Sequence, residues 1–75
     1  LDEPIIAPSA SKHGLSREGI LHAYRNPLAD LGLGDGFTMM IGPTGPALIL
    51  EVGYVEADLA MVIIHAMPAR EKYLR

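Results

Sequence analysis

The sequence contains no cysteine and no tryptophan, and aromatic residues make up only 5% of it. Without cysteine, the chain can form neither disulfide bonds nor thiolate metal sites. Its longest uninterrupted apolar runs are Ala47–Leu50 and Leu59–Ile64, far short of the roughly 20 residues that a membrane-spanning helix needs. The N-terminus also lacks the basic start and long apolar stretch of a signal peptide. These absences favour a cytoplasmic protein.

The residues that are present favour one small folded domain spanning 1–75. The chain has 75 residues, of which 49% are apolar, and a net charge of −3. This apolar fraction is too high for a disordered chain, although a domain of this size buries only about 60% of its unfolded surface. The acidic balance argues against a broad nucleic-acid footprint. Cations nevertheless gather at the two ends, in 12–25 and 70–75, so a local basic patch is compatible with the sequence.

Residues 16–25 carry the clearest helix signals. Ser16 is a favourable N-cap, and Glu18 in the first turn suits the helix dipole. Leu15 and Ile20 occupy the two positions of a hydrophobic staple. The proline after residue 26 ends the helix. A single helical turn is also predicted over 8–13.

The remainder of the chain has the pattern of short strands. Phe37–Ile41 alternates in hydrophobicity, and Gly42–Pro46 has the composition of a loop. Short connections between strands imply antiparallel pairing. Ala69–Arg75 is predicted to be a short basic helix. The predicted strands are 28–31, 37–41, 47–55 and 60–67. The expected fold class is therefore α+β: short N-terminal helices packed on a three- to four-stranded antiparallel sheet, with a short C-terminal helix.

Two motifs are better explained by structure than by ligand binding. Gly32-x-Gly34-x-Gly36 does not have the spacing of a dinucleotide fingerprint and is followed by a strand, so it predicts a turn. The three histidines are widely separated and lack the spacing of a zinc site. We therefore predict no metal and no cofactor.

Glu51 interrupts the longest apolar strand and admits two interpretations. The simpler one is that it marks a solvated sheet face, and the functional one is that it acts as a general base on an open sheet surface. His65, in the next strand, could lie on the same face of the sheet as Glu51 or on the opposite face, and the length of the hairpin loop decides which. A two-residue hairpin loop would put Glu51 and His65 on opposite faces, whereas a three-residue loop would put them on the same face.

The basic residues at the two ends suggest RNA chemistry. If Lys12 and the C-terminal tail converge, Lys12, Arg70 and Lys72 would form a cationic patch. Cations stabilise the charge of a pentavalent phosphate, and a histidine moves the protons. The alternative is an ordinary solvated tail.

The segment Lys12-His13-Gly14-Leu15-Ser16, followed by a helix and the exit Asn26-Pro27-Leu28, resembles the BrnT family of bacterial toxins. The resemblance implies a RelE-like fold, metal-independent ribonuclease activity that blocks translation, and pairing with a DNA-binding antitoxin. It covers roughly residues 9–75, with its specific part at 12–28. In place of the family's I-S-A-R segment, this chain has Ile64-His65-Ala66-Met67. The family arginine is thus replaced by Met67, and Arg70 lies three residues later.

The first hypothesis is therefore the RNA-cleaving toxin of a toxin–antitoxin module. Its partners would be a cognate antitoxin and RNA, with a second copy of the chain as a further candidate and no membrane. The alternative is a non-catalytic protein-binding or dimerisation domain of the same fold. The candidate catalytic residues are His13, His65 and Glu51, and the candidate RNA phosphate-binding residues are Lys12, Arg70, Lys72 and Arg25.

Overall fold

The computed structural model describes residues 3–45 and 48–74 and consists mainly of β-sheet. Pro46, Ala47 and Arg75, which belong to predicted elements, lie outside the described residues. The elements in chain order are β1 (Ile5–Ile6), η1 (Pro8–Ser11), α1 (Arg17–Arg25), β2 (Ala29–Gly34), β3 (Phe37–Thr44), β4 (Leu48–Glu56), β5 (Met61–Pro68) and η2 (Glu71–Tyr73). Elements η1 and η2 are 3₁₀-helical turns.

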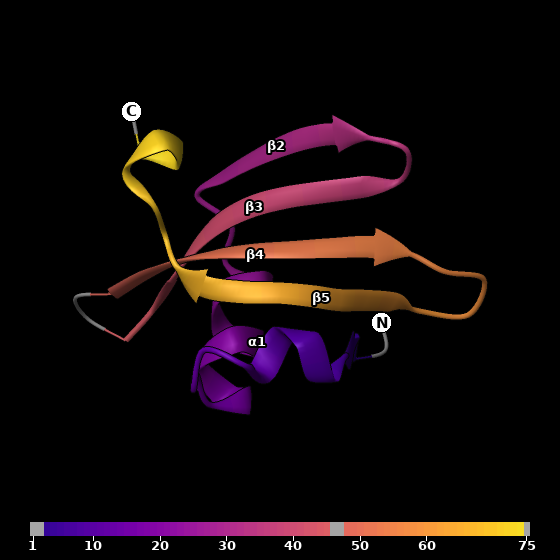
Figure 1. The fold of residues 1–75 in the computed structure, drawn as a ribbon, viewed down its shortest axis with the longest axis horizontal. Helices are drawn as coiled ribbons and strands as arrows, with labels where there is room; N and C mark the ends of the chain where they lie inside the picture. Colours follow the sequence, from indigo (N-terminus) through magenta and orange to yellow (C-terminus); the bar gives the residue numbers. More distant parts are fainter. Residues whose placement is uncertain (1–2, 46–47, 75) are drawn as a thin grey trace.

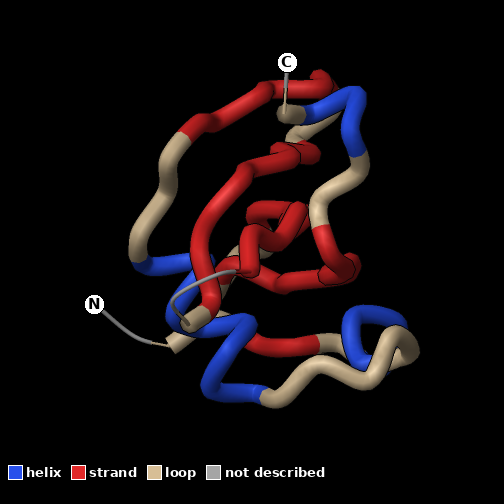
Figure 2. Tube along the Cα trace, turned by 90° about the vertical axis from the view of Figure 1, so that its left-hand side faces the viewer, coloured by secondary structure: helices blue, strands red, loops and turns tan. Residues whose placement is uncertain are grey.

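The five described strands form one sheet in the order β1-β5-β4-β3-β2. Strands β2 to β5 are joined by short turns and pair antiparallel with their neighbours in sequence. Strand β1 is added to the edge beside β5 and runs parallel to it, with Ile5 opposite Val62. The helix α1 lies against the sheet (Figure 1), which curves strongly in the side view of Figure 2.

The predicted fold class is wrong in three respects. The described sheet has five strands and is mixed, because the two residues of β1 pair in parallel with the last strand. Among the described residues α1 is the one α-helix, and the second N-terminal helical element, η1, is only a 3₁₀ turn. The C-terminal helix is reduced to the 3₁₀ turn η2, because a segment this short gains little from helical hydrogen bonds alone.

The predicted helix is confirmed, and its start follows from the sequence. The hydroxyl of Ser16 accepts a hydrogen bond of 3.0 Å from the backbone N–H of Gly19, as an N-cap should. Gly14 precedes it with a φ of 78°, a left-handed conformation that glycine adopts without a steric penalty. The predicted loop 42–46 is wrong at its start, since β3 continues through Gly42 and Pro43 to Thr44.

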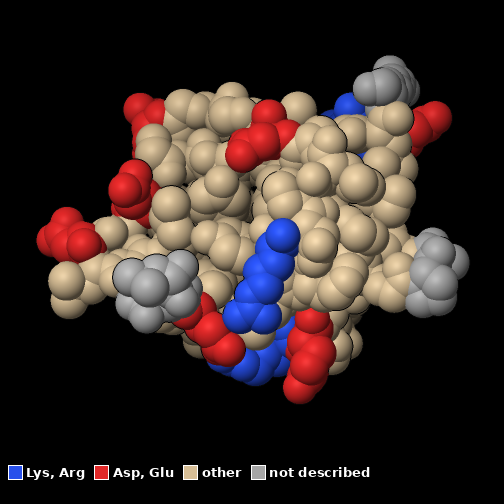
Figure 3. Space-filling view, turned by 180° about the vertical axis from the view of Figure 1, so that it is seen from behind, with Lys and Arg blue, Asp and Glu red and all other residues tan. Residues whose placement is uncertain are grey.

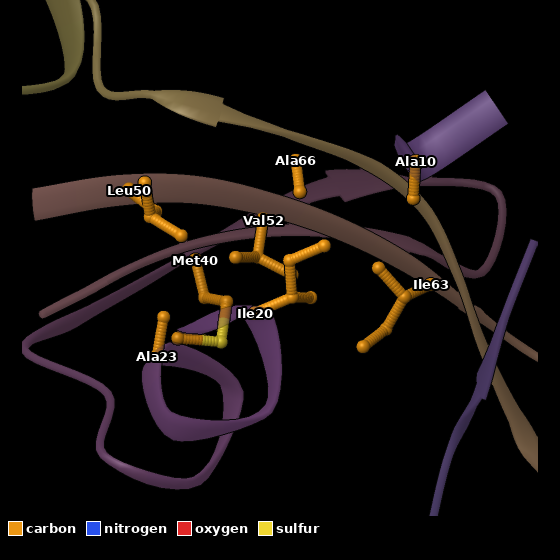
Figure 4. Packing of buried hydrophobic residues seen from close by; sticks show 8 residues of the cluster. All are labelled: Ala10, Ile20, Ala23, Met40, Leu50, Val52, Ile63 and Ala66. Carbon is orange, nitrogen blue, oxygen red and sulfur yellow. The ribbon is translucent and has the colours of Figure 1, made fainter. Parts of the chain in front are cut away.

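One face of the sheet packs against α1 and η1 to form the core. Figure 4 shows the fully buried side chains of this cluster, which come from both helical elements and from β3, β4 and β5. They are Ala10, Ile20, Ala23, Met40, Leu50, Val52, Ile63 and Ala66. Because side chains alternate along a strand, the residues between them, including Glu51, point to the opposite face.

The helix approaches β3 closely at Gly42. A Cβ atom built on this glycine would overlap the backbone carbonyl oxygen of Ala23. The distance between helix and sheet is therefore set by the absence of a side chain at this position. None of the described helices is long enough and apolar enough to span a membrane.

We predict that Gly42→Ala lowers the free energy of unfolding by roughly 2–3 kcal/mol, because α1 must move away from β3 to accommodate the methyl group. Urea denaturation followed by circular dichroism measures this change. The matched control is Gly32→Ala in β2, where a Cβ meets no atom within 4 Å. Equal stability of the two variants would contradict the close approach.

Candidate functional site

Glu51 is a fully buried carboxylate in the middle of β4, with 0% of its surface exposed. Its Oε2 lies 2.8 Å from Nε2 of His65 and 2.7 Å from Nη2 of Arg70. Its Oε1 accepts hydrogen bonds from the backbone N–H of Arg70 at 2.9 Å and from the Nε–H of Arg70 at 3.1 Å. Both oxygens of the carboxylate are thus compensated by donors, as a buried charge requires.

Arg70 reaches this carboxylate because the chain turns over the sheet after β5. The N–H of Ala69 donates a 2.9 Å hydrogen bond to the carbonyl of Ile49 on β4, one residue beyond the Leu50–Pro68 pair, which holds the start of this segment beside β4. The backbone and the guanidinium of Arg70 then both face Glu51. The Arg70 side chain remains 47% exposed, so one side of the guanidinium faces the carboxylate while the rest meets solvent.

A β-bulge in β5 decides the position of His65. Near the turn, Glu56 lies opposite Met61 and Tyr54 opposite Ile63; beyond the bulge, Gly53 lies opposite His65. Ile64 is the extra residue, and it shifts every later side chain of β5 to the other face. Without the bulge, His65 would lie on the face of the core. The bulge therefore brings His65 to the side of Glu51.

The bulge is held by η1. The hydroxyl of Ser9 donates a 2.7 Å hydrogen bond to the carbonyl of Ile64, and the chain continues from there to His13. The rings of His13 and His65 meet edge to face, with their centroids 6.2 Å apart at an interplanar angle of 78°. Two histidines that are 52 positions apart in the sequence thus become neighbours.

The neighbours of Glu51 determine its charge state. Burial raises the pKa of its carboxyl, but the hydrogen bonds from Arg70 and His65 outweigh that effect and lower the pKa to about 2. Glu51 is therefore ionised at neutral pH and can only accept hydrogen bonds. It follows that Nε2 of His65 carries a proton and donates a hydrogen bond to Glu51, which leaves Nδ1 as the ring nitrogen that can accept one.

The structure brings together four of the predicted site residues: Glu51, His65, Arg70 and His13. The interpretation of Glu51 as the mark of a solvated face is wrong, because Arg70 and His65 lie over it and exclude solvent. The same enclosure rules out an exposed general base on an open sheet. The hypothesis that placed Glu51 and His65 on one face is confirmed, although the bulge, rather than a three-residue loop, produces that arrangement.

The remaining predicted residues lie at or beyond the margin of this cluster. Lys12 is exposed and directly precedes His13. The ammonium of Lys72 lies 5.0 Å from the ring centre of Tyr73, and the guanidinium carbon of Arg70 lies 5.4 Å from the same centre. Arg25 lies on α1, where it faces Glu3, and does not join the cluster.

Two residues near the cluster were not identified from the sequence. Tyr73 contacts Arg70 and Lys72, and its position between basic residues was the available signal. Gly53 lies opposite His65, and a Cβ atom there would come within 2.7 Å of the Phe37 ring and 3.2 Å of the His65 Cβ. The missing side chain of Gly53 leaves the room that both rings occupy.

Within residues 3–45 and 48–74, no three metal-ligating side chains converge in a way that could hold a metal ion. Glu51 has both oxygens engaged by Arg70 and His65. The groups left for chemistry are the rings of His13 and His65, which can transfer protons, and the exposed part of Arg70, which can bind an anion.

No protein-family model, no curated protein and no solved structure gives a significant match to this chain.

We predict that stability depends on the charge of Glu51 at acidic pH. Between its ordinary pKa of 4.5 and its folded pKa of about 2, the unfolded state binds the proton and the folded state does not, so the free energy of unfolding falls as the pH falls. The loss is on the order of 3 kcal/mol. Glu51→Gln removes this part of the pH dependence, measured by urea denaturation from pH 6 to about 2.

The matched control is Glu56→Gln, at the exposed end of the same strand. This variant should keep the wild-type decrease. If Glu51→Gln loses stability with falling pH as steeply as wild type does, the ionised state assigned to Glu51 is wrong.

Proposed function

We propose that this chain is a BrnT-like toxin, the RNA-cleaving component of a bacterial toxin–antitoxin module that acts in the cytoplasm. The observation that carries the proposal is the contact between His13, from the Lys-His-Gly segment, and His65, which is itself bonded to Glu51. Arg70 is bonded to the same carboxylate. Two proton-transferring groups and a cation thus lie together at one partly exposed place.

Such a cluster is suited to cleavage of RNA by its own 2′-hydroxyl. One histidine removes the proton of the 2′-hydroxyl, whose oxygen then forms a bond to the adjacent phosphorus. The bond from phosphorus to the 5′-oxygen breaks, and the second histidine donates a proton to that oxygen. The products are a 2′,3′-cyclic phosphate and a free 5′-hydroxyl, and no metal ion takes part in any step.

In this proposal His65 is the base and His13 the acid. Glu51 holds the proton on Nε2 of His65, which leaves Nδ1 to accept the proton of the hydroxyl, and it stabilises the imidazolium that forms. Glu51 is therefore a positioning residue. His13 is exposed and close enough to His65 for both rings to meet one phosphodiester.

The cations have the role of binding the phosphate. The exposed part of Arg70, and Lys12, which precedes His13 in the chain, would stabilise the negative charge that develops on phosphorus oxygens. Lys72 extends the same patch along the tail. Because the chain carries a net charge of −3, binding of RNA would depend on these few local cations and would weaken with salt in proportion to the small number of phosphates that they neutralise.

Two observations favour the alternative, a non-catalytic protein-binding domain. The carboxylate of Glu51 is fully occupied by partners, as in a purely structural ion cluster. Met67 also stands where the resemblance predicts an arginine. The two functions differ in a simple outcome, because a toxin arrests growth when expressed alone and a binding domain does not.

We predict that the purified chain cleaves single-stranded RNA without added metal, and that His13→Ala lowers the cleavage rate by at least about 100-fold, the usual contribution of a general acid or base. Because His13 is exposed, the variant should retain its fold. The double variant His13→Ala, Arg70→Ala should lose cleavage entirely while it remains folded by circular dichroism, and expression of wild type should arrest bacterial growth.

The matched control is His22→Ala. His22 lies on α1, away from the cluster, and its Nδ1–H donates a 2.8 Å hydrogen bond to the carbonyl of Pro43. This variant should cleave RNA at the wild-type rate. Cleavage that survives the loss of His13 would refute its assignment as the acid. If expression of the chain leaves bacterial growth unchanged and the purified chain cleaves no RNA in the presence of a chelator, the toxin proposal is refuted and the binding domain is supported.

A further inference from the structure

A second charged site lies on the outer side of α1. A groove of about 390 Å³ runs between the helix and the N-terminal segment, lined by Glu3, Arg17, Glu18, Leu21, His22, Arg25 and Asn26. Its volume is near the lower end of the roughly 300–1,000 Å³ typical of small-ligand sites. Figure 3 shows blue basic atoms gathered low on this face of the molecule, between two groups of red acidic atoms.

The groove already holds one carboxylate of the chain itself. Nη2 of Arg17 donates a 2.5 Å hydrogen bond to one oxygen of Glu3, and Nη2 of Arg25 lies 3.5 Å from the other oxygen. Arg17 and Arg25 are eight residues apart on one side of the helix, so a single carboxylate lies between two guanidinium groups. The contacts of Glu3 thus show that this groove can bind a carboxylate.

We propose that the groove is a docking site for an extended acidic segment of a protein partner, whose carboxylate takes the place of Glu3 between Arg17 and Arg25. A guanidinium group binds a carboxylate through paired, charge-assisted hydrogen bonds. The side chains of all three residues are about half exposed. Exposed ion pairs of this kind contribute little to stability, so a partner can displace Glu3 at small cost.

The composition of the groove favours a peptide over a nucleic acid. Glu18 is part of its lining and would repel a continuous phosphate backbone, whereas one carboxylate can avoid it. Leu21, 6% exposed, leaves only a small apolar contact at the floor of the groove. Two acidic and two basic residues line the groove, so it lacks the net positive charge that attracts RNA.

This docking site is independent of the proposed RNA cleavage. α1 covers the face of the sheet formed by Met40, Leu50 and Val52, and Glu51 points to the other face because side chains alternate along β4. A partner segment could therefore occupy the groove without touching the Glu51 cluster. Failure of one proposal leaves the other unaffected.

The experiment is a titration with a blocked tetrapeptide, acetyl-Ala-Glu-Pro-Ala-amide, followed by NMR of the arginine Nε–H groups. In Glu3→Gln, whose groove has lost its internal carboxylate, the peptide should shift the Nε–H signals of Arg17 and Arg25 in a saturable way. It should bind about threefold to tenfold more weakly to wild type, where Glu3 competes, as expected for two exposed ion pairs.

The controls separate docking from general electrostatics. The glutamine version of the peptide should not bind, and the double variant Arg17→Gln, Arg25→Gln should not bind the glutamate peptide. Glu18→Gln changes the charge of the groove equally but removes no competitor, so its gain in affinity should be smaller than that of Glu3→Gln. Equal affinity of wild type and Glu3→Gln, or stronger shifts of Arg17 and Arg25 by an RNA oligonucleotide than by the peptide, would overturn the proposal.

Discussion

The burial of a single carboxylate imposes the most demanding constraint on this structure. An ionised side chain with no exposed surface must receive hydrogen bonds at both oxygens, and Glu51 receives them from Arg70 and His65. These donors reach Glu51 because the chain turns back over the sheet after β5 and because a bulge in β5 puts His65 on the same face as Glu51. The room for His65 depends in turn on the missing side chain of Gly53.

The same interactions that compensate the charge also prepare the cluster for chemistry. An ionised Glu51 fixes the proton of His65 on one nitrogen and leaves the other available. It also holds Arg70 through both its backbone and its guanidinium group, so that a long, flexible side chain loses much of its freedom. Stability and the proposed catalytic geometry are therefore two consequences of one network. This network and the groove beside α1 lie on different sides of the sheet, so the small domain offers two separate surfaces.

Local signals predicted the parts of the fold that local interactions stabilise. The helix began and ended where its N-cap and its proline indicated, because both act within one turn of chain. The antiparallel order of β2 to β5 followed from the short connections. The parallel strand β1 was not predicted, since two residues carry no pattern and their pairing with Val62 and Ile63 joins distant parts of the chain. The prediction of a C-terminal helix was wrong because the start of that segment, Ala69 and Arg70, is held by contacts with Ile49 and Glu51. These contacts form only in the folded sheet.

The sequence by itself determined which groups the cluster can use: His13, His65, the carboxylate of Glu51 and a basic tail, with no cysteine to offer thiolate chemistry. It also determined that Glu51 and His65 lie on strands that are consecutive in the chain. Only the tertiary structure decided that they meet. Side chains alternate with a period of two, so a single extra residue at Ile64 moves His65 from the core to the side of Glu51. The carbonyl of Ile64 in that bulge accepts a hydrogen bond from Ser9, 55 positions away, and no pattern in the strand itself could reveal this contact.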